Sequence, residues 1–157
     1  MNYLGYACIN MGFSSLPKSQ RITTNRTMIK RTFHDRGIEY ASELALQNLR
    51  DLRKILEWNL ENDIYFYRLS SDIVPWASEY DLTDMPNYGA IHAAALSAGN
   101  FARQHNMRLT SHPGPFNKLA SPKERVFQLT KTDLSVHGDL FDLLGLPRTP
   151  YAKLNIH

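Results

Sequence analysis

Short apolar runs alternate along the chain with longer stretches in which apolar residues recur every three or four positions. Runs of the first kind predict strands, and they lie at residues 2–9, 64–71, 107–112 and 152–157. Residues 43–59 carry Ala45, Leu49, Leu52 and Leu56 on one stripe and predict a helix. The alanine-rich residues 88–106 predict a second helix by the same spacing.

A third helix is predicted by signals at both of its ends. Ser121 is expected to be its N-cap, with Pro122 at the first helical position and Glu124 completing a capping box. Apolar positions then continue as far as Leu144, where Gly145 predicts the end of the helix.

The resulting order of elements, βαβαβαβ, predicts parallel strands joined by right-handed crossovers. A doubly wound sheet and a (β/α)₈ barrel both begin in this way. The sequence contains no GxGxxG after a strand and no GxxxxGK[ST], which argues against the nucleotide-binding forms of the open sheet.

The length of the chain favours part of a barrel over a complete one. A complete barrel needs about 250 residues, and rarely fewer than about 200. The 157 residues with four strands therefore correspond to half of one. A chain that ends on a strand also leaves an open hydrogen-bonding edge. We expect residues 1–157 to be the N-terminal half of a single, truncated TIM-barrel domain.

Composition narrows the class of protein. The hydrophobic content of 43% and charged content of 21% are typical of a globular domain. No apolar stretch has the length of a membrane span, and the first residues lack the features of a signal peptide, so we expect an intracellular, cytoplasmic protein with no membrane partner. Cys8 is the single cysteine, which excludes an intrachain disulfide and a cysteine-based zinc site.

The positive charge is modest but unevenly placed. A net charge of +3 is compatible with a phosphate-bearing partner. Within residues 18–36, Asp35 is the only acid among the basic residues Lys18, Arg21, Arg26, Lys30, Arg31 and Arg36. This segment reads either as a solvated loop or as a phosphate-contacting surface.

Candidate chemistry lies just past the predicted strands, where parallel α/β folds gather their active sites. His112 follows the third strand and His157 ends the fourth, so their imidazoles would point into one shared mouth. Imidazole is a common ligand of zinc and manganese, and Glu79 after the second strand could complete such a site. A histidine where a strand ends can equally be a plain polar residue. His137, on the third helix, is expected to have a hydrogen-bonded packing role.

Six collinear segments resemble the UV damage endonuclease family. They are LGYACIN at residues 4–10, TTNRT at 23–27, ALQNLRDLRKILEWN at 45–59, YRLSSDIVPWASEY at 67–80, RLTSHPGPFNKLASP at 108–122 and LNIH at 154–157. The resemblance implies a (β/α)₈ barrel that holds divalent metal ions. Manganese is the expected metal, and magnesium and zinc are the alternatives. The resemblance also implies a monomer at full length that nicks damaged double-stranded DNA immediately 5′ of ultraviolet photoproducts.

The resemblance assigns metal ligands residue by residue. His112 and His157 match ligands that serve catalysis, at the ends of the third and fourth strands. Glu79 stands where many members have a histidine ligand, and glutamate also binds manganese. The remaining ligands of the family lie beyond His157, so we expect the chain to be inactive alone.

The resemblance also implies contacts with damaged DNA. Tyr6 and Asn10 match residues close to the damaged nucleotides. Pro115 and Phe116 match a probe that enters the duplex, although Pro115 replaces the usual glutamine and makes the probe apolar. Arg26 belongs to the basic segment that would contact phosphates without reading sequence.

Three alternatives stay open at this stage. A similar barrel could act on abasic sites in DNA, or it could isomerise a sugar. The chain could also be a non-catalytic remnant that binds DNA weakly and in a salt-sensitive way.

Overall fold

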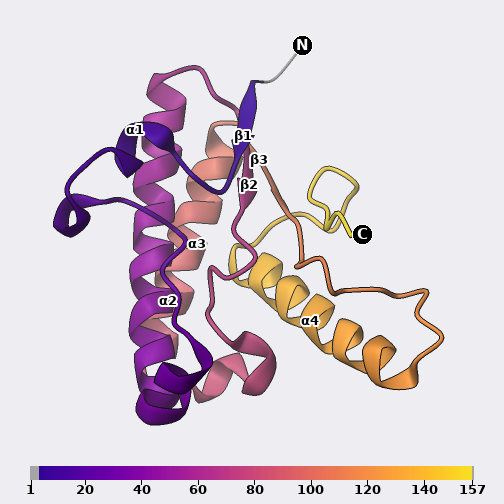
Figure 1. The fold of residues 1–157 in the computed structure, drawn as a ribbon. Helices are drawn as coiled ribbons and strands as arrows, with labels where there is room; N and C mark the ends of the chain where they lie inside the picture. The colour runs from indigo at the N-terminus through magenta and orange to yellow at the C-terminus, as the bar shows by residue number, and fades with distance from the viewer. Residues whose placement is uncertain (1–3, 157) are drawn as a thin grey trace.

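The structure, a computed structural model, describes residues 4–156 and shows parallel strands alternating with helices (Figure 1). Its strands are β1 (Gly5–Ala7), β2 (Phe66–Leu69) and β3 (Arg108–Ser111), in the order β1-β2-β3. Its helices are α1 (Met11–Ser14), α2 (Lys30–Glu61), α3 (Tyr88–Gln104) and α4 (Glu124–Leu143), with 3₁₀ turns η1 (Lys18–Gln20), η2 (Ala77–Glu79) and η3 (Leu82–Asp84). No helix in this part of the chain is both long and apolar enough to cross a membrane.

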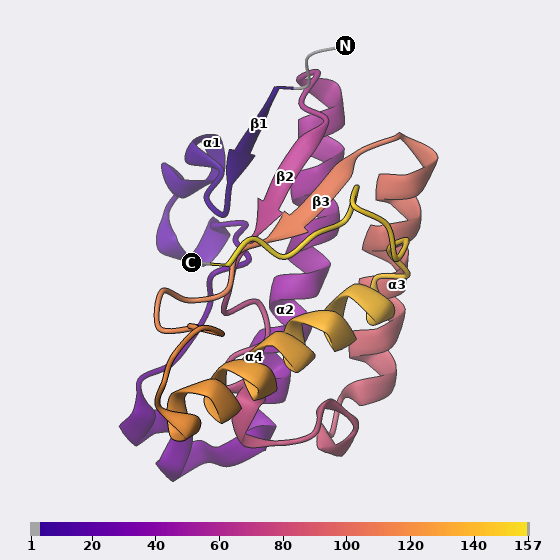
Figure 2. The same ribbon diagram turned by 90° about the vertical axis from the view of Figure 1, so that its right-hand side faces the viewer.

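The two faces of the sheet have different surroundings. Tyr67, Leu69 and Leu109 point to one face, are buried, and belong to the same core as the leucines of α2 and the alanines of α3. Phe66 and Arg68 point to the other face and are half-buried. Figure 2 shows α2 and α3 behind the strands, with α4 crossing below them. A sheet covered by helices on one side only has the layout of part of a barrel wall.

The apolar stripe predicted for residues 43–59 forms the buried face of α2. Leu49, Leu52 and Leu56 are fully buried there, and each contributes roughly 1.5–3 kcal/mol by leaving water. The helix is longer than predicted, because it begins at Lys30 and passes through a kink at Gly37, where φ is 64°. Its first turns contribute Phe33 to a small cluster with Ala41 and Leu44 that is separate from the main core.

The predicted start of α4 is wrong, whereas its predicted end is confirmed. Ser121 is not the N-cap, because its hydroxyl accepts a 3.2 Å hydrogen bond from the amide of Lys123 and closes a turn before the helix. At the far end, Gly145 adopts φ 62°, as its position predicted. The amide of Leu146 bonds the carbonyl of Phe141 at 3.0 Å, which completes a Schellman motif.

The last predicted strand forms a single bridge instead of a strand. Leu154 pairs in parallel with Ser111, so the segment lies beside β3 as expected. The amide of Ser111 donates to Lys153 at 3.2 Å, and the amide of Asn155 donates to Ser111 at 2.9 Å. His157, like the first residues of the first predicted strand, lies outside the described residues.

Candidate functional site at the carboxyl ends of the strands

β1 ends in a tight turn at Cys8, which lies in the left-handed region with φ 59°. The amide of Cys8 continues the sheet by donating to Arg68 at 2.9 Å. Its carbonyl accepts hydrogen bonds from the Tyr67 hydroxyl at 2.8 Å and from the Asn25 amide group at 3.0 Å. The turn is therefore held by two side chains from distant parts of the chain, in a conformation that is costly for a residue other than glycine.

Tyr6 and Asn10, both predicted to lie near a damaged nucleotide, are in direct contact. The Asn10 amide group donates to the Tyr6 hydroxyl at 2.9 Å, and that hydroxyl donates to Asn59 at 2.6 Å. Burial raises the pKa of Tyr6, while the bonds to Asn10 and Asn59 lower it, so the phenol is neutral at physiological pH. Asn10 also caps α1 by accepting from the amide of Phe13 at 3.2 Å.

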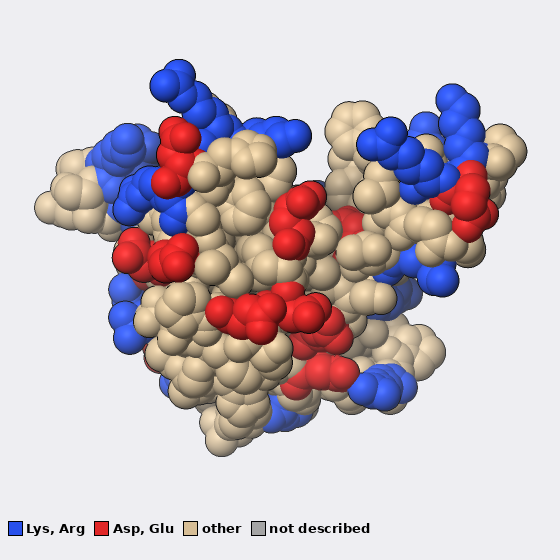
Figure 3. All heavy atoms as spheres, turned by 90° about the horizontal axis from the view of Figure 1, so that it is seen from below, with Lys and Arg blue, Asp and Glu red and all other residues tan. Residues whose placement is uncertain are grey.

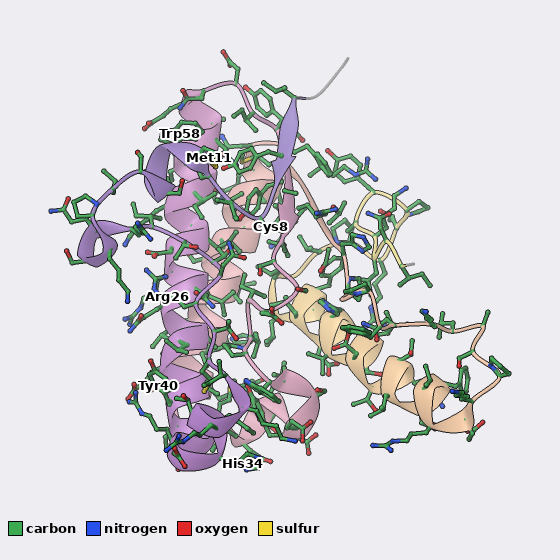
Figure 4. All side chains as sticks on the ribbon, viewed as in Figure 1. Cys8, Met11, Arg26, His34, Tyr40 and Trp58 are labelled. Carbon is green, nitrogen blue, oxygen red and sulfur yellow. The ribbon has the colours of Figure 1, made fainter. Side chains whose placement is uncertain are left out.

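The loop at residues 23–27 crosses the same strand ends and is fixed to α2 through Arg26. The guanidinium forms a 2.7 Å ion pair with Asp51 and donates to the carbonyls of Thr23 at 2.6 Å and Arg21 at 2.9 Å. Arg26 lies against α2 in Figure 4. Its hydrogen-bonding groups are directed to the protein itself, so it shapes the loop, and its contact with DNA stays a prediction.

The basic segment singled out in the sequence includes this loop, and five of its cations are exposed: Lys18, Arg21, Lys30, Arg31 and Arg36. Figure 3 views the molecule from below and shows acidic side chains at the centre of that face, with lysines and arginines at its margins. The basic segment, in which Asp35 is the single acid, is a candidate for contact with a polyanion.

The loop after β3 displays two of the predicted residues at its tip. His112 leaves the strand half-buried, and Pro115 and Phe116 are exposed, with 88% of Phe116 accessible. Asn117 is buried directly behind them. Both its backbone amide and its side-chain amide donate to the carbonyl of Gly114 at 3.1 Å. The loop thus presents an aromatic ring on a closed turn.

A cavity of about 960 Å³ lies beneath this loop and is bordered by Phe116, Asp72, Asp133 and His137, among others. The buried ring of His137 shares a 3.1 Å hydrogen bond with the Ser111 hydroxyl through Nδ1. Burial lowers the pKa of His137, against the opposing effects of Asp133 and Asp72. Burial is the main effect that raises the pKa of Asp72, and the nearby charge of Asp133 raises it further. The imidazole is therefore neutral at physiological pH, and the predicted packing role of His137 is confirmed.

The predicted metal ligands do not meet within the described residues. Glu79 is exposed at the end of η2 and lines a hollow with Asp81, Asp84 and Asp139, away from His112. In residues 4–156, no three His, Cys, Asp or Glu side chains form a group that could hold a metal ion. This donor set does not fit a complete metal centre, so the ligand roles of Glu79, His112 and His157 stay predictions.

Sequence reasoning missed the three polar residues that α2 buries within the predicted stripe of residues 43–59: Asn48, Asp51 and Asn59. Asn48 binds both the amide and the carbonyl of Arg26, at 3.1 and 2.9 Å, and also donates to the carbonyl of Ile73 at 3.0 Å. The available signal was their position among the leucines of the apolar stripe, where a polar side chain needs a buried partner.

Comparison with known proteins connects this geometry to a family. The sequence model described as UV-endonuclease UvdE matches residues 2–157. The UV-damage endonuclease of Schizosaccharomyces pombe is 35% identical over 143 residues, which cover 91% of this chain and 23% of that protein. The UV DNA damage endonuclease of Clostridium perfringens is 29% identical over 136 residues, covering 87% and 32%.

A solved structure agrees. The crystal structure of SacUVDE superimposes with a TM-score of 0.82 at 27% identity, covering 99% of this chain and 48% of that one. The chain thus spans half or less of the length of these relatives and matches the N-terminal part. Its fold is of the α/β TIM-barrel type, as chain length and the family resemblance predicted. The chain belongs to the UV-endonuclease UvdE family.

Proposed function

We propose that this chain is the N-terminal part of a DNA-repair endonuclease that acts on ultraviolet-damaged DNA. The observation that carries the proposal is the exposed ring of Phe116, displayed on a closed turn at the strand ends of a UvdE-family chain. The relatives named for UV damage support this substrate. No observation favours an abasic-site enzyme or a sugar isomerase.

The recognition step follows from the shape of this loop. An aromatic ring that is 88% exposed loses unfavourable contact with water when it enters a stack of bases. Photolesions stack and pair poorly, so turning them out costs less than the few kcal/mol required by an intact base. Pro115 limits the backbone freedom of the tip, which reduces the entropy lost on insertion.

The other strand ends complete the proposed contact surface. Tyr6 and Asn10 form one hydrogen-bonded pair, which we propose lies close to the displaced nucleotides. The exposed cations of residues 18–36 contact phosphates without reading sequence, and Arg26 positions the loop among them.

We further propose that incision lies 5′ of the lesion and depends on a divalent metal, with Mn²⁺ as the first expectation. Phosphodiester hydrolysis needs an activated water, neutralised phosphoryl oxygens and a stabilised leaving alkoxide, and metal ions supply all three. His112, His157 and Glu79 are the proposed ligands from this chain. The described residues do not form a complete centre, so no catalytic step is assigned to the metal.

Binding of defined duplexes tests the recognition step. We expect the chain to bind a fluorescent duplex with one cyclobutane dimer more tightly than the undamaged duplex. Phe116→Ala should reduce that preference by about 5-fold or more, because stacking of a base on an aromatic ring contributes roughly 1–3 kcal/mol. Leu96→Ala, on α3, is the control and should leave it unchanged. Equal affinity of the wild type for both duplexes would refute the proposal.

A further inference from the structure

One face of α4 carries three polar side chains at spacings of three and four residues: Thr130, Asp133 and His137. We call them the α4 polar stripe. Thr130 and His137 are buried, and Asp133 is half-buried. Neighbouring positions of the helix, such as Val126 and Leu140, are apolar. Residues three and four apart share one side of a helix, so the stripe faces a single structure.

That structure is the loop that leaves β3. At its base, His137 bonds the hydroxyl of Ser111, the residue directly before His112. The backbone of Ser111 is held from the other side by Lys153 and Asn155. The start of the loop is therefore fixed both by the neighbouring segment and by the stripe.

The stripe also holds the loop just after its tip. Asp133 accepts a hydrogen bond from the side-chain amide of Asn117, which itself closes the turn on Gly114. Thr130 accepts a 3.0 Å hydrogen bond from the backbone amide of Lys118 and donates within the helix to Val126 at 2.8 Å. The stripe thus bonds the loop at residues 111, 117 and 118, on both sides of Phe116.

Polar contacts suit this task better than apolar ones. A hydrogen bond fixes both distance and direction, whereas apolar packing is not directional. With valine at position 130, the Lys118 amide would lose its acceptor, at a cost typical of an unmade hydrogen bond. Hydrogen bonds to the stripe therefore select one position of the loop, whereas apolar packing against α4 would allow many.

We propose that the α4 polar stripe consists of positioning residues that fix the loop carrying Pro115 and Phe116 and thereby set the preference for damaged DNA. None of the three residues needs to touch the nucleic acid. The effect on preference rests on the proposed function, whereas the effect on the loop does not.

Thr130→Val provides the test, because it keeps the shape of the side chain and removes the acceptor. The matched control is Thr132→Val, whose hydroxyl donates only within α4, to Gln128 at 3.2 Å. The first readout is hydrogen exchange of the Lys118 backbone amide, measured by NMR. The second is the ratio of affinities for the duplex with a cyclobutane dimer and for the undamaged duplex, measured by fluorescence anisotropy. We expect Thr130→Val to reduce protection of the Lys118 amide about tenfold, corresponding to roughly 1.4 kcal/mol, and to reduce the preference at least threefold.

Further variants separate the possible outcomes. Thr130→Ser should restore both readouts, and Asp133→Ala should release the Asn117 side-chain amide even if Thr130→Val does not fold. Unchanged Lys118 protection in Thr130→Val, or an equal loss in Thr132→Val, would overturn the proposal. If the wild type shows no preference for damaged DNA, the proposed function fails, and Lys118 protection alone decides whether the stripe positions the loop.

Discussion

Asp51 is the point at which the loop of residues 23–27 is fixed to α2, and Asp51→Ala removes that point. Its side chain is only 8% exposed and forms ion pairs with Arg26 at 2.7 Å and Lys54 at 2.9 Å. It also accepts the backbone amide of Thr23 at 3.2 Å. The substitution therefore leaves the backbone amide of Thr23 without its acceptor and the Arg26 guanidinium without its charged partner, although Arg26 keeps its bonds to two carbonyls.

The structure sets the expected loss of stability. Lys54 is 55% exposed, so its pair contributes less than about 1 kcal/mol. Arg26 is 26% exposed, and a charge-assisted bond of this kind contributes roughly 1.5–3 kcal/mol before screening by solvent. The Thr23 amide adds about 0.5–1.5 kcal/mol. We expect Asp51→Ala to lower the free energy of unfolding by about 2–3 kcal/mol.

Urea unfolding followed by circular dichroism measures this loss. The control is Asp35→Ala, because Asp35 and Arg31 form a 3.8 Å pair in which both side chains are exposed, and it should cost less than about 0.5 kcal/mol. A double-mutant cycle with Arg26→Ala should give a coupling of about 1 kcal/mol or more. The reasoning is refuted if Asp51→Ala costs no more than Asp35→Ala, or if the coupling is zero.

Three further predictions concern α3, α4 and the proposed metal site. Gly99→Ala places a Cβ against the Leu144 carbonyl oxygen and should lower the free energy of unfolding by about 1–3 kcal/mol, measured in urea. Gly89→Ala, whose Cβ would have nothing within 4 Å, should stabilise α3 slightly. Burial lowers the pKa of His137 from its ordinary value of 6.5, so the stability present above pH 6.5 should be lost as the pH falls from there through the lower pKa of the folded state. Urea unfolding at several pH values should show a smaller loss of stability toward low pH in His137→Gln than in the wild type. An equal pH dependence of stability in the two proteins would contradict this assignment. Mn²⁺ should raise the melting temperature of the wild type but not of His112→Ala, and no shift in the wild type would contradict a metal role for this chain.

The sequence predicted the elements whose signals are local. The spacing of leucines located the buried face of α2, and Gly145 located the end of α4. The first turns of α2 were missed because their partners are distant. Phe33 stacks on Trp76 at 5.3 Å, and no local period records a contact between residues 43 positions apart.

The candidate site was predictable only in part. The resemblance implied that Tyr6 and Asn10 both lie close to the damaged nucleotides, which stays a prediction, and the structure joins the two side chains by a hydrogen bond. The supporting residues Asn48 and Asp51 were not predicted, because their partners lie in a loop more than 20 residues earlier in the chain. A sequence shows that such a residue is polar within an apolar stripe, but only the fold shows which backbone group it meets.

The two loops at the strand ends share one physical solution. Each runs outside the sheet, so its buried amides and carbonyls lack strand partners, and leaving them unpaired would cost about 1–3 kcal/mol each. α2 supplies Asn48 and Asp51 to the loop around Arg26, and α4 supplies its polar stripe to the loop around Phe116. Because each helix also packs into the core, both loops take their position from the same packing that stabilises the domain. Substitutions on these helices should therefore change recognition of damaged DNA, even though they replace none of the side chains that are proposed to contact the DNA.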